Sequence, residues 1–238
     1  MRTRMLWPDS SPNDLTDWRP LADDLQCFLE QQGLYSLVGA GHSMGATTTL
    51  RLALRLPDIF SALILIDPVF FPPHMILASD LIFRFRLNYK IHPLVKGALK
   101  RRNIFESRQA MFANYRQKAI FSRIDDPGLW AYVDAMAKPR PDGQIELAYP
   151  PQWEARIYVT GVRADMELWR LLPGLKPPVL IIRGADTNTF WEKTARRVQR
   201  ILPSAQVISI PGATHLVPLE QPARVAELAW AFLSEQRR

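Results

Sequence analysis

One serine in this sequence has the surroundings of a catalytic nucleophile. Ser43 lies in the pentapeptide Gly41-His42-Ser43-Met44-Gly45, which follows the apolar run 37–40 and precedes the helix-like stretch 46–56. A strand, a sharp turn and a helix in this order are the context of a G-x-S-x-G nucleophile elbow. Its glycines let the helix and a neighbouring strand approach a serine held in a strained backbone conformation. We therefore predict that Ser43 is a nucleophile.

The pentapeptide alone is just as typical of an ordinary strand-to-helix turn, so the interpretation depends on a second site. His215 lies in the segment 212–222, after the apolar run 207–210 and before a C-terminal helical pattern. A serine followed by a histidine near the C-terminus is the chain order of one family of catalytic triads. A serine hydroxyl needs a base during attack, and His215 is the histidine placed to be that base. Three other histidines lack this context: His42, His74 and His92.

On these two sites the chain resembles the α/β-hydrolases, of the esterase and lipase-like kind. The match runs from about residue 17 to the C-terminus and is weak between residues 72 and 172, where such proteins vary most. The resemblance implies a serine hydrolase that cleaves a carboxylic ester or a related acyl compound through an acyl-enzyme on Ser43. It implies neither a metal nor an organic cofactor. Haloalkane dehalogenases and epoxide hydrolases of this fold need a carboxylate nucleophile, so a serine argues against their chemistry.

Two aspartates are candidates for the third member of the triad, which fixes the imidazole tautomer. Relatives commonly show Gly-x-x-Asp or Gly-x-x-Ser-Asp after a late strand, whereas this chain reads Gly184-Ala185-Asp186-Thr187-Asn188-Thr189. The usual acid position of the longer form falls on Asn188, while Asp186 comes two residues after the glycine. Asp67, in Ile66-Asp67-Pro68, occupies the family's other acid position, although aspartate before proline is also a frequent turn residue. The sequence therefore leaves open whether the triad acid is Asp186, Asp67 or neither of them.

The resemblance also implies an oxyanion hole with two backbone donors, one of them the amide of Met44. The second donor normally comes from the loop after an earlier strand, which carries a His-Gly-type motif. The residues before the elbow hold one helix and an irregular start, Met1 to Pro8, so we expect an N-terminally truncated fold. The strand that ends in Ser43 would then be an exposed sheet edge through which the chain could self-associate. A second hypothesis is a weak or inactive hydrolase-fold fragment that binds an acidic partner or a lipid.

Apolar patterns predict the elements that position these residues. Short and almost wholly apolar runs are typical of parallel strands buried on both faces. They occupy residues 35–40, 62–66, 179–182 and 207–210. Helical spacing of apolar residues covers 17–32, 191–202 and 219–236. Alternating strands and helices predict an α/β fold with a parallel sheet and helices on both faces.

The strand pattern stops between Asp67 and Pro177, which predicts an inserted helical cap or lid at 71–172. The hydrolase core would comprise 1–70 and 173–238. Helix-like stretches in the insertion cover 75–85, 93–115 and 127–136. Several large apolar side chains there could line an acyl pocket, although each is more often core. They are Phe70, Phe71, Met75, Phe83, Met111, Phe112 and Trp130.

The net charge of +7 is concentrated in one strip of the insertion. Ten basic residues accompany one acidic residue, Glu106, between positions 84 and 118. They are Arg84, Arg86, Lys90, Lys96, Lys100, Arg101, Arg102, Arg108, Arg116 and Lys118. Such a strip could attract acidic substrates, a membrane surface or nucleic acid, but a solvated helix face is the plainer explanation. No aromatic stacking platform accompanies it, so we predict no nucleic-acid partner.

The remaining composition favours an ordinary globular enzyme. A chain of 238 residues with 47% hydrophobic content can bury a core. Its single cysteine, Cys27, allows no intrachain disulfide and is compatible with a reducing compartment. No segment has the apolar length of a signal peptide or a membrane span, so we expect a cytoplasmic protein with a small-molecule acyl substrate.

Overall fold

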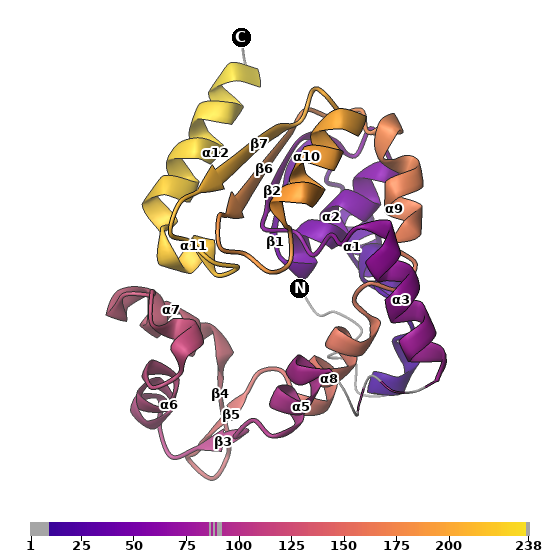
Figure 1. The fold of residues 1–238 in the computed structure, drawn as a ribbon. Helices are drawn as coiled ribbons and strands as arrows, with labels where there is room; N and C mark the ends of the chain where they lie inside the picture. The colour runs from indigo at the N-terminus through magenta and orange to yellow at the C-terminus, as the bar shows by residue number, and fades with distance from the viewer. Residues whose placement is uncertain (1–9, 86, 88, 90–91, 237–238) are drawn as a thin grey trace. The chain divides into compact units, whose positions relative to one another are not determined.

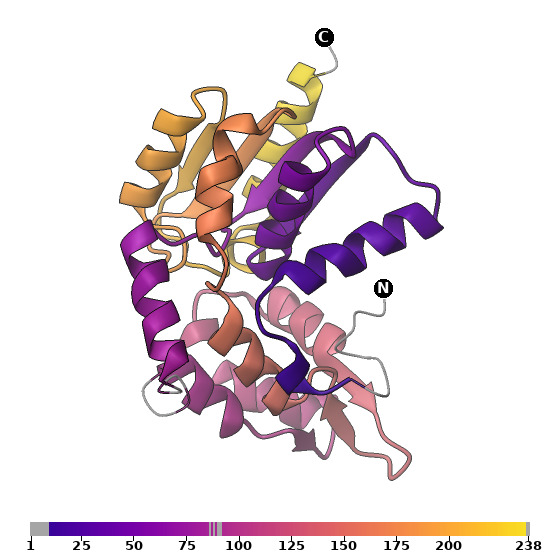
Figure 2. The ribbon, with the colours of Figure 1, turned by 90° about the vertical axis from the view of Figure 1, so that its right-hand side faces the viewer.

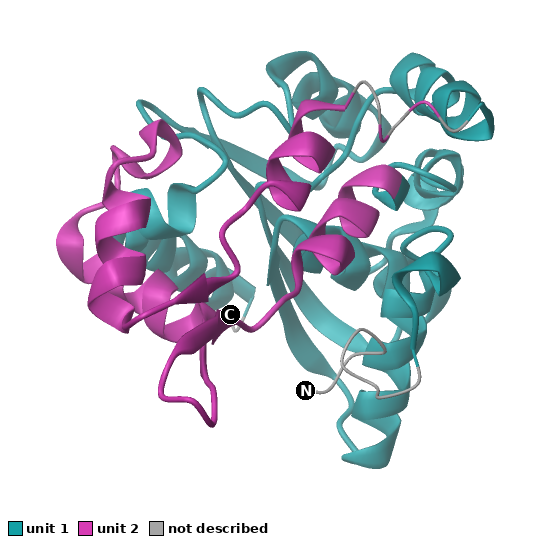
Figure 3. Cartoon of the chain, turned by 90° about the horizontal axis from the view of Figure 1, so that it is seen from below, with its two compact units in different colours: residues 1–85, 160–238 teal, residues 86–159 magenta. Residues whose placement is uncertain are grey.

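The computed structural model describes residues 10–85, 87, 89 and 92–236. These residues form two compact units: unit 1 comprises 1–85 and 160–238, and unit 2 comprises 86–159 (Figure 3). The insertion predicted at 71–172 extends beyond unit 2 at both ends, and its role as a lid remains a prediction. The predicted irregular start, Met1 to Pro8, lies outside the described residues, as do Arg86 and Lys90 of the basic strip.

Unit 1 is built on a four-stranded parallel sheet with the strand order β1-β2-β6-β7. The strands are β1 (Leu37–His42), β2 (Phe60–Ile66), β6 (Val179–Gly184) and β7 (Gln206–Ile210). All four predicted strands are present. Every residue of β6 is buried, because β2 and β7 flank it and helices cover both faces. This explains why its sequence is a continuous apolar run rather than an alternating one.

Helices cover both faces of this sheet (Figures 1 and 2). One face carries α1 (Arg19–Gln31), α2 (Met44–Arg55), α9 (Met166–Leu171) and α10 (Glu192–Ile201). The other face carries α11 (Val217–Glu220) and α12 (Pro222–Gln236). The side chains of successive strand residues point alternately to the two faces of the sheet. Leu63 packs in the hydrophobic cluster on the first face and Ile64 in the cluster on the other. Two apolar layers therefore hold the ends of the strands in fixed positions.

Further elements complete unit 1. The helix α3 (Pro73–Arg84) packs against α9, and α9 also packs against α2. For this reason the two ends of the predicted insertion belong to unit 1. Phe70 is buried and stacks on Trp169 with ring centroids 4.5 Å apart, so it is core. Short 3-10 helices lie at η2 (Pro12–Asp14) and η4 (Leu172–Gly174).

Among the described residues, the strand β1 lies at an edge of the sheet, and the N-terminally truncated fold remains a prediction. Within the described residues its neighbour in the sheet is β2 alone. Val38 is 45% exposed, although its register partner Ala62 is buried in the cluster beneath α12. Tyr35, just before the strand, is 65% exposed. The edge therefore presents apolar side chains to solvent, and the predicted self-association remains a prediction.

Unit 2 combines helices with a small antiparallel sheet of order β3-β5-β4, which the sequence patterns did not predict. Its elements are α5 (Pro93–Leu99), β3 (Ile104–Phe105), α6 (Arg108–Arg116), η3 (Ala119–Phe121), α7 (Asp126–Met136), β4 (Ala137–Pro139), β5 (Ile145–Leu147) and α8 (Pro151–Thr160). The continuous helix predicted over 93–115 is wrong. Its pattern is interrupted by β3, and the Ser107 hydroxyl then accepts a hydrogen bond from the Ala110 N–H and begins α6 anew.

The helices found in the described part of the chain are all too short or too polar to cross a membrane.

Candidate active site

Ser43 occupies the turn between β1 and α2, where the backbone takes up a strained conformation. Its φ of 56° and ψ of −121° are rare for a residue with a side chain. The turn is tight enough that a Cβ atom on Gly41 would lie 2.5 Å from the carbonyl carbon of Gly45. Gly41 is therefore required for the helix to approach the strand, as the nucleophile-elbow motif predicts. The Ser43 hydroxyl is held at the carboxyl end of the sheet, next to the loop after β7.

The structure brings Ser43, His215 and Asp67 together within unit 1. The Nε2 atom of His215 lies 2.8 Å from the Ser43 Oγ, and its Nδ1 atom lies 3.0 Å from the Asp67 Oδ1. If Nδ1–H donates to the carboxylate, Nε2 is left to accept the serine proton. These contacts join residues up to 172 positions apart in the chain. This is the geometry of a serine hydroxyl, a base and an orienting acid.

Asp67 follows β2 and has a fully buried side chain. Its Oδ2 accepts a hydrogen bond from the Gly184 backbone N–H at 2.8 Å. Its Oδ1 accepts hydroxyl hydrogen bonds from Thr187 and Thr189, both at 2.6 Å. Burial by itself raises the pKa of Asp67, but the hydrogen bonds from His215, Thr187, Thr189 and Gly184 outweigh it and hold the pKa below its usual value. The carboxyl group is therefore ionised at neutral pH.

Asp186 has a different position from the one expected of a triad acid. Its side chain is exposed, while its backbone N–H donates to the Ala213 carbonyl at 2.9 Å. Asn188, which falls on the acid position of the longer Gly-x-x-Ser-Asp form of the family's motif, is exposed as well. The hydrogen bonds that His215 Nδ1 makes in the structure are with Asp67 and Thr189. Of the two candidate aspartates, the geometry thus favours Asp67.

Thr187 and Thr189 are site residues that sequence reasoning missed. They lie in the loop after β6, which is the loop searched for the acid itself. Because β6 and β2 are adjacent parallel strands, the loop after β6 lies beside the residue that ends β2. The only hint of their role in the sequence was that this loop carries two residues with hydroxyl groups. They become significant only once Asp67 is taken as the acid that they stabilise.

The loop that carries His215 is held in place from two sides. The Glu220 carboxylate accepts hydrogen bonds from the backbone N–H and the hydroxyl of Thr214, both at 2.6 Å. On the other side, a Cβ atom on Gly184 would lie 2.2 Å from the Thr214 carbonyl oxygen, so only glycine allows this approach. The imidazole position is therefore set by backbone contacts as well as by Asp67.

Met44 is the first residue of α2, and no side chain caps this helix. The first backbone N–H groups of a helix have no partner within the helix and carry its positive dipole end. The role of the Met44 N–H as an oxyanion donor beside Ser43 remains a prediction, with which its place at the helix start is consistent. The Ser43 N–H, in contrast, donates to the Ile66 carbonyl at 3.0 Å and is already used.

Comparisons with known proteins agree with this fold. A model of the alpha/beta hydrolase family matches residues 6–228. The chain is 22% identical to the sn-1-specific diacylglycerol lipase ABHD11 of Mus musculus over 231 residues, 95% of this chain and 68% of that protein. It is 22% identical to the esterase YbfF of Escherichia coli (strain K12) over 226 residues, 94% of this chain and 78% of that protein.

Solved structures show the same likeness. The crystal structure of E-2-(acetamidomethylene)succinate hydrolase matches with a TM-score of 0.71 and 21% identity, over 95% of this chain and 76% of that one. An esterase from Mycobacterium tuberculosis matches with a TM-score of 0.67 and 19% identity, over 92% of this chain and 68% of that one. At these identities the structural matches support the fold and do not identify a substrate.

Proposed function

Since the chain belongs to the alpha/beta hydrolase family, we propose that it hydrolyses a carboxylic ester or a related acyl compound through a covalent intermediate on Ser43. The observation that carries this proposal is the continuous set of hydrogen bonds from Ser43 through His215 to Asp67, at 2.8 Å and 3.0 Å. A serine hydroxyl that has no base nearby is a poor nucleophile, and this arrangement supplies the base and its orienting acid.

In the first half of the proposed reaction, the Ser43 Oγ attacks the carbonyl carbon of the substrate while His215 Nε2 accepts the hydroxyl proton. The new C–O bond gives a tetrahedral intermediate with a negatively charged oxygen. His215 then donates the proton to the departing alkoxide as its C–O bond breaks, which leaves an alcohol and an acyl-Ser43 ester. Asp67 stays ionised and stabilises the imidazolium during both steps.

In the second half, a water molecule attacks the acyl-Ser43 carbonyl while His215 Nε2 accepts one of its protons. The resulting intermediate collapses when the C–O bond to Ser43 breaks, and His215 returns the proton to the Ser43 Oγ. The products are the free serine and a carboxylic acid. The Met44 N–H would donate to the charged oxygen in each intermediate, and one such donor typically contributes about 10²- to 10³-fold in turnover.

The names of the relatives favour an ester substrate among the acyl compounds. One curated relative is a diacylglycerol lipase and another is an esterase. A neutral ester also suits an activated serine, because the leaving alkoxide can take its proton from His215.

Hydrolysis of p-nitrophenyl acetate, butyrate and octanoate tests this function. We expect turnover of at least one ester by the full chain, and a loss of at least about 10³-fold in Ser43→Ala, since the nucleophile is gone. Ser204→Ala, at an exposed serine far from the site in the sequence, is the matched control and should retain full activity. Equal turnover by Ser43→Ala and the unchanged protein would contradict the proposal.

A further inference from the structure

Unit 2 contains a pocket in which four of the six lining residues are cationic. Its volume is about 480 Å³, which lies within the range of roughly 300 to 1,000 Å³ that small-molecule sites occupy. The lining residues are Gly97, Lys100, Arg101, Arg102, Asn114 and Lys118. None of them carries a carboxylate. All of them belong to unit 2, whereas Ser43 belongs to unit 1.

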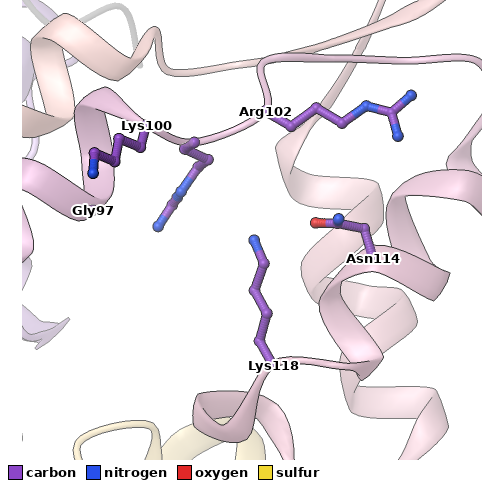
Figure 4. A pocket seen from close by; sticks show the side chains of 6 residues that line it. Gly97, Lys100, Arg102, Asn114 and Lys118 are labelled. Carbon is purple, nitrogen blue, oxygen red and sulfur yellow. The ribbon is translucent and has the colours of Figure 1, made fainter.

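Two segments of the chain contribute these cations. Lys100, Arg101 and Arg102 follow the end of α5, while Asn114 lies in α6 and Lys118 just beyond it. Figure 4 shows Lys100 and Arg102 on one stretch of chain, with their side chains directed away from each other, and Lys118 extending toward that stretch from the opposite side. Like charges brought together in this way repel one another, so the arrangement costs free energy unless an anion offsets it.

One of the four cations is already paired with a carboxylate. Arg101 forms an ion pair with Glu154 at 2.9 Å. Arg102 uses its Nε to donate to the Ile104 carbonyl at 2.8 Å, which leaves its terminal nitrogens for another acceptor. Lys118 Nζ lies 4.4 Å from the centroid of the Tyr115 ring, a contact that holds it but does not neutralise it. Among the residues that the structure describes, no carboxylate pairs with Lys100, Arg102 or Lys118.

The environment of Lys118 is consistent with a position prepared for an anion. Burial, followed by the positive charge of Arg101, lowers the pKa of its ammonium group. Both effects penalise the charged form of Lys118, while the Glu154 carboxylate partly offsets them. A bound anion would reverse the second of them, because it would sit between the two positive charges.

We propose that this pocket binds a phosphomonoester group. Near neutral pH such a group carries close to two negative charges on three acceptor oxygens, whereas a carboxylate carries one charge on two. Lys100, Arg102 and Lys118 each bring charged N–H donors to the pocket lining, and arginine and lysine are side chains that commonly bind phosphate in proteins. The pocket is larger than a phosphate group requires, so the ligand also has an organic part. A small phosphorylated metabolite and a phospholipid headgroup share this chemistry.

Isothermal titration of the full chain with glycerol 3-phosphate tests the proposal. We expect saturable binding with one site per chain, weakened at least about tenfold in Lys100→Gln/Lys118→Gln, because a hydrogen bond to a charged group typically contributes that much. Lys96→Gln removes the same kind of charge from an exposed position of α5 outside the pocket lining, and it should bind as the unchanged protein does. Arg102→Gln gives a second variant should the double variant melt early.

Vesicles distinguish the two sources of the phosphate group. If the ligand is a lipid headgroup, the protein should cosediment with vesicles of phosphatidylcholine that contain phosphatidic acid, and glycerol 3-phosphate should compete. If it is a small metabolite, titration should show binding while the vesicles recover no protein. Either result supports the pocket. Absence of saturable glycerol 3-phosphate binding, or equal weakening by Lys96→Gln, would overturn it.

Discussion

The Nε2 atom of His42 donates a hydrogen bond to the backbone carbonyl oxygen of His215 over 2.7 Å. The two imidazole rings lie side by side, with centroids 4.9 Å apart. His42 comes directly before Ser43 and His215 is the proposed base, so this bond ties the nucleophile turn to the loop of the base. Burial lowers the pKa of His42, so its ring stays neutral at neutral pH. The ring therefore adds no positive charge next to the His215 imidazolium that forms in the proposed reaction.

Loss of this bond should impair catalysis without removing it. We expect His42→Phe to lower kcat by roughly 2- to 13-fold, the equivalent of a net hydrogen bond of about 0.5 to 1.5 kcal/mol, with KM little changed. His42→Gln retains a donor and should be less affected. Steady-state kinetics on a p-nitrophenyl ester measure both. Equal effects of the two variants would show that ring packing, rather than the hydrogen bond, is what matters.

The identity of the triad acid can be tested with a matched pair of substitutions. Asp67→Asn should lower kcat by roughly 10³- to 10⁴-fold, because an amide no longer favours the imidazole tautomer that accepts the serine proton. Asp186→Asn, at the exposed candidate, should leave kcat within about twofold, as expected for a change at an exposed surface position. Thermal melting of both variants checks that they fold. The reverse ranking of the two would identify Asp186 as the acid.

The threonine hydroxyls on Asp67 should contribute stability that depends on pH. The pKa of Asp67 in the folded chain lies below the 3.8 of an ordinary aspartate, so its ionisation stabilises the fold above about pH 4, and this contribution disappears as the pH falls through the lowered pKa. Thr189→Val removes one donor and raises the pKa of Asp67. We expect the variant to lose roughly 1 to 3 kcal/mol in the free energy of unfolding at pH 7 and less at pH 3, which lies below the ordinary aspartate pKa of 3.8.

Urea denaturation at the two pH values measures this difference. Thr189→Ser keeps the hydroxyl and should behave like the unchanged protein. A loss of the same size at pH 3 and pH 7 would mean that the threonine acts through packing rather than through the charge of Asp67.

The exposed edge of the sheet leads to a prediction about association. Val38 presents an apolar side chain on β1, and unpaired edge strands of this kind readily pair with another chain. We expect concentration-dependent self-association in sedimentation velocity, reduced by Val38→Lys. Leu77→Lys, at a 60% exposed position of α3, adds the same charge away from β1 and should have no effect. An equal effect of the two lysines would exclude β1 as the contact.

The sequence was informative wherever one residue type or one periodic pattern determined the structure. Buried parallel strands are continuous apolar runs, so all four strands of the sheet could be predicted. Ser43 and His215, whose side chains the structure brings within 2.8 Å of each other, could be selected as candidates because each has a distinctive local context. The two-residue strand β3 and its partners could not, since strands this short carry no periodic signal.

The choice between Asp67 and Asp186 could not be made from local sequence either. Both follow strands and both precede turns, so only the alignment of β2 beside β6 reveals which carboxylate reaches His215. The burial of Asp67 is tolerated because hydroxyls from the neighbouring loop satisfy it, and this is a property of tertiary structure. A sequence motif describes a single loop, so it cannot predict hydrogen bonds between side chains of two different loops.

Reaction with a fluorophosphonate, read by intact mass, is the most direct test of the central proposal, an activated serine at position 43. The reagent forms a covalent bond only with a serine whose proton is removed by a neighbouring base. We predict a single adduct on the unchanged protein, none on Ser43→Ala and strongly slowed labelling of His215→Ala. A folded protein that takes up no label, or Ser43→Ala labelled as fast as the unchanged protein, would contradict the account.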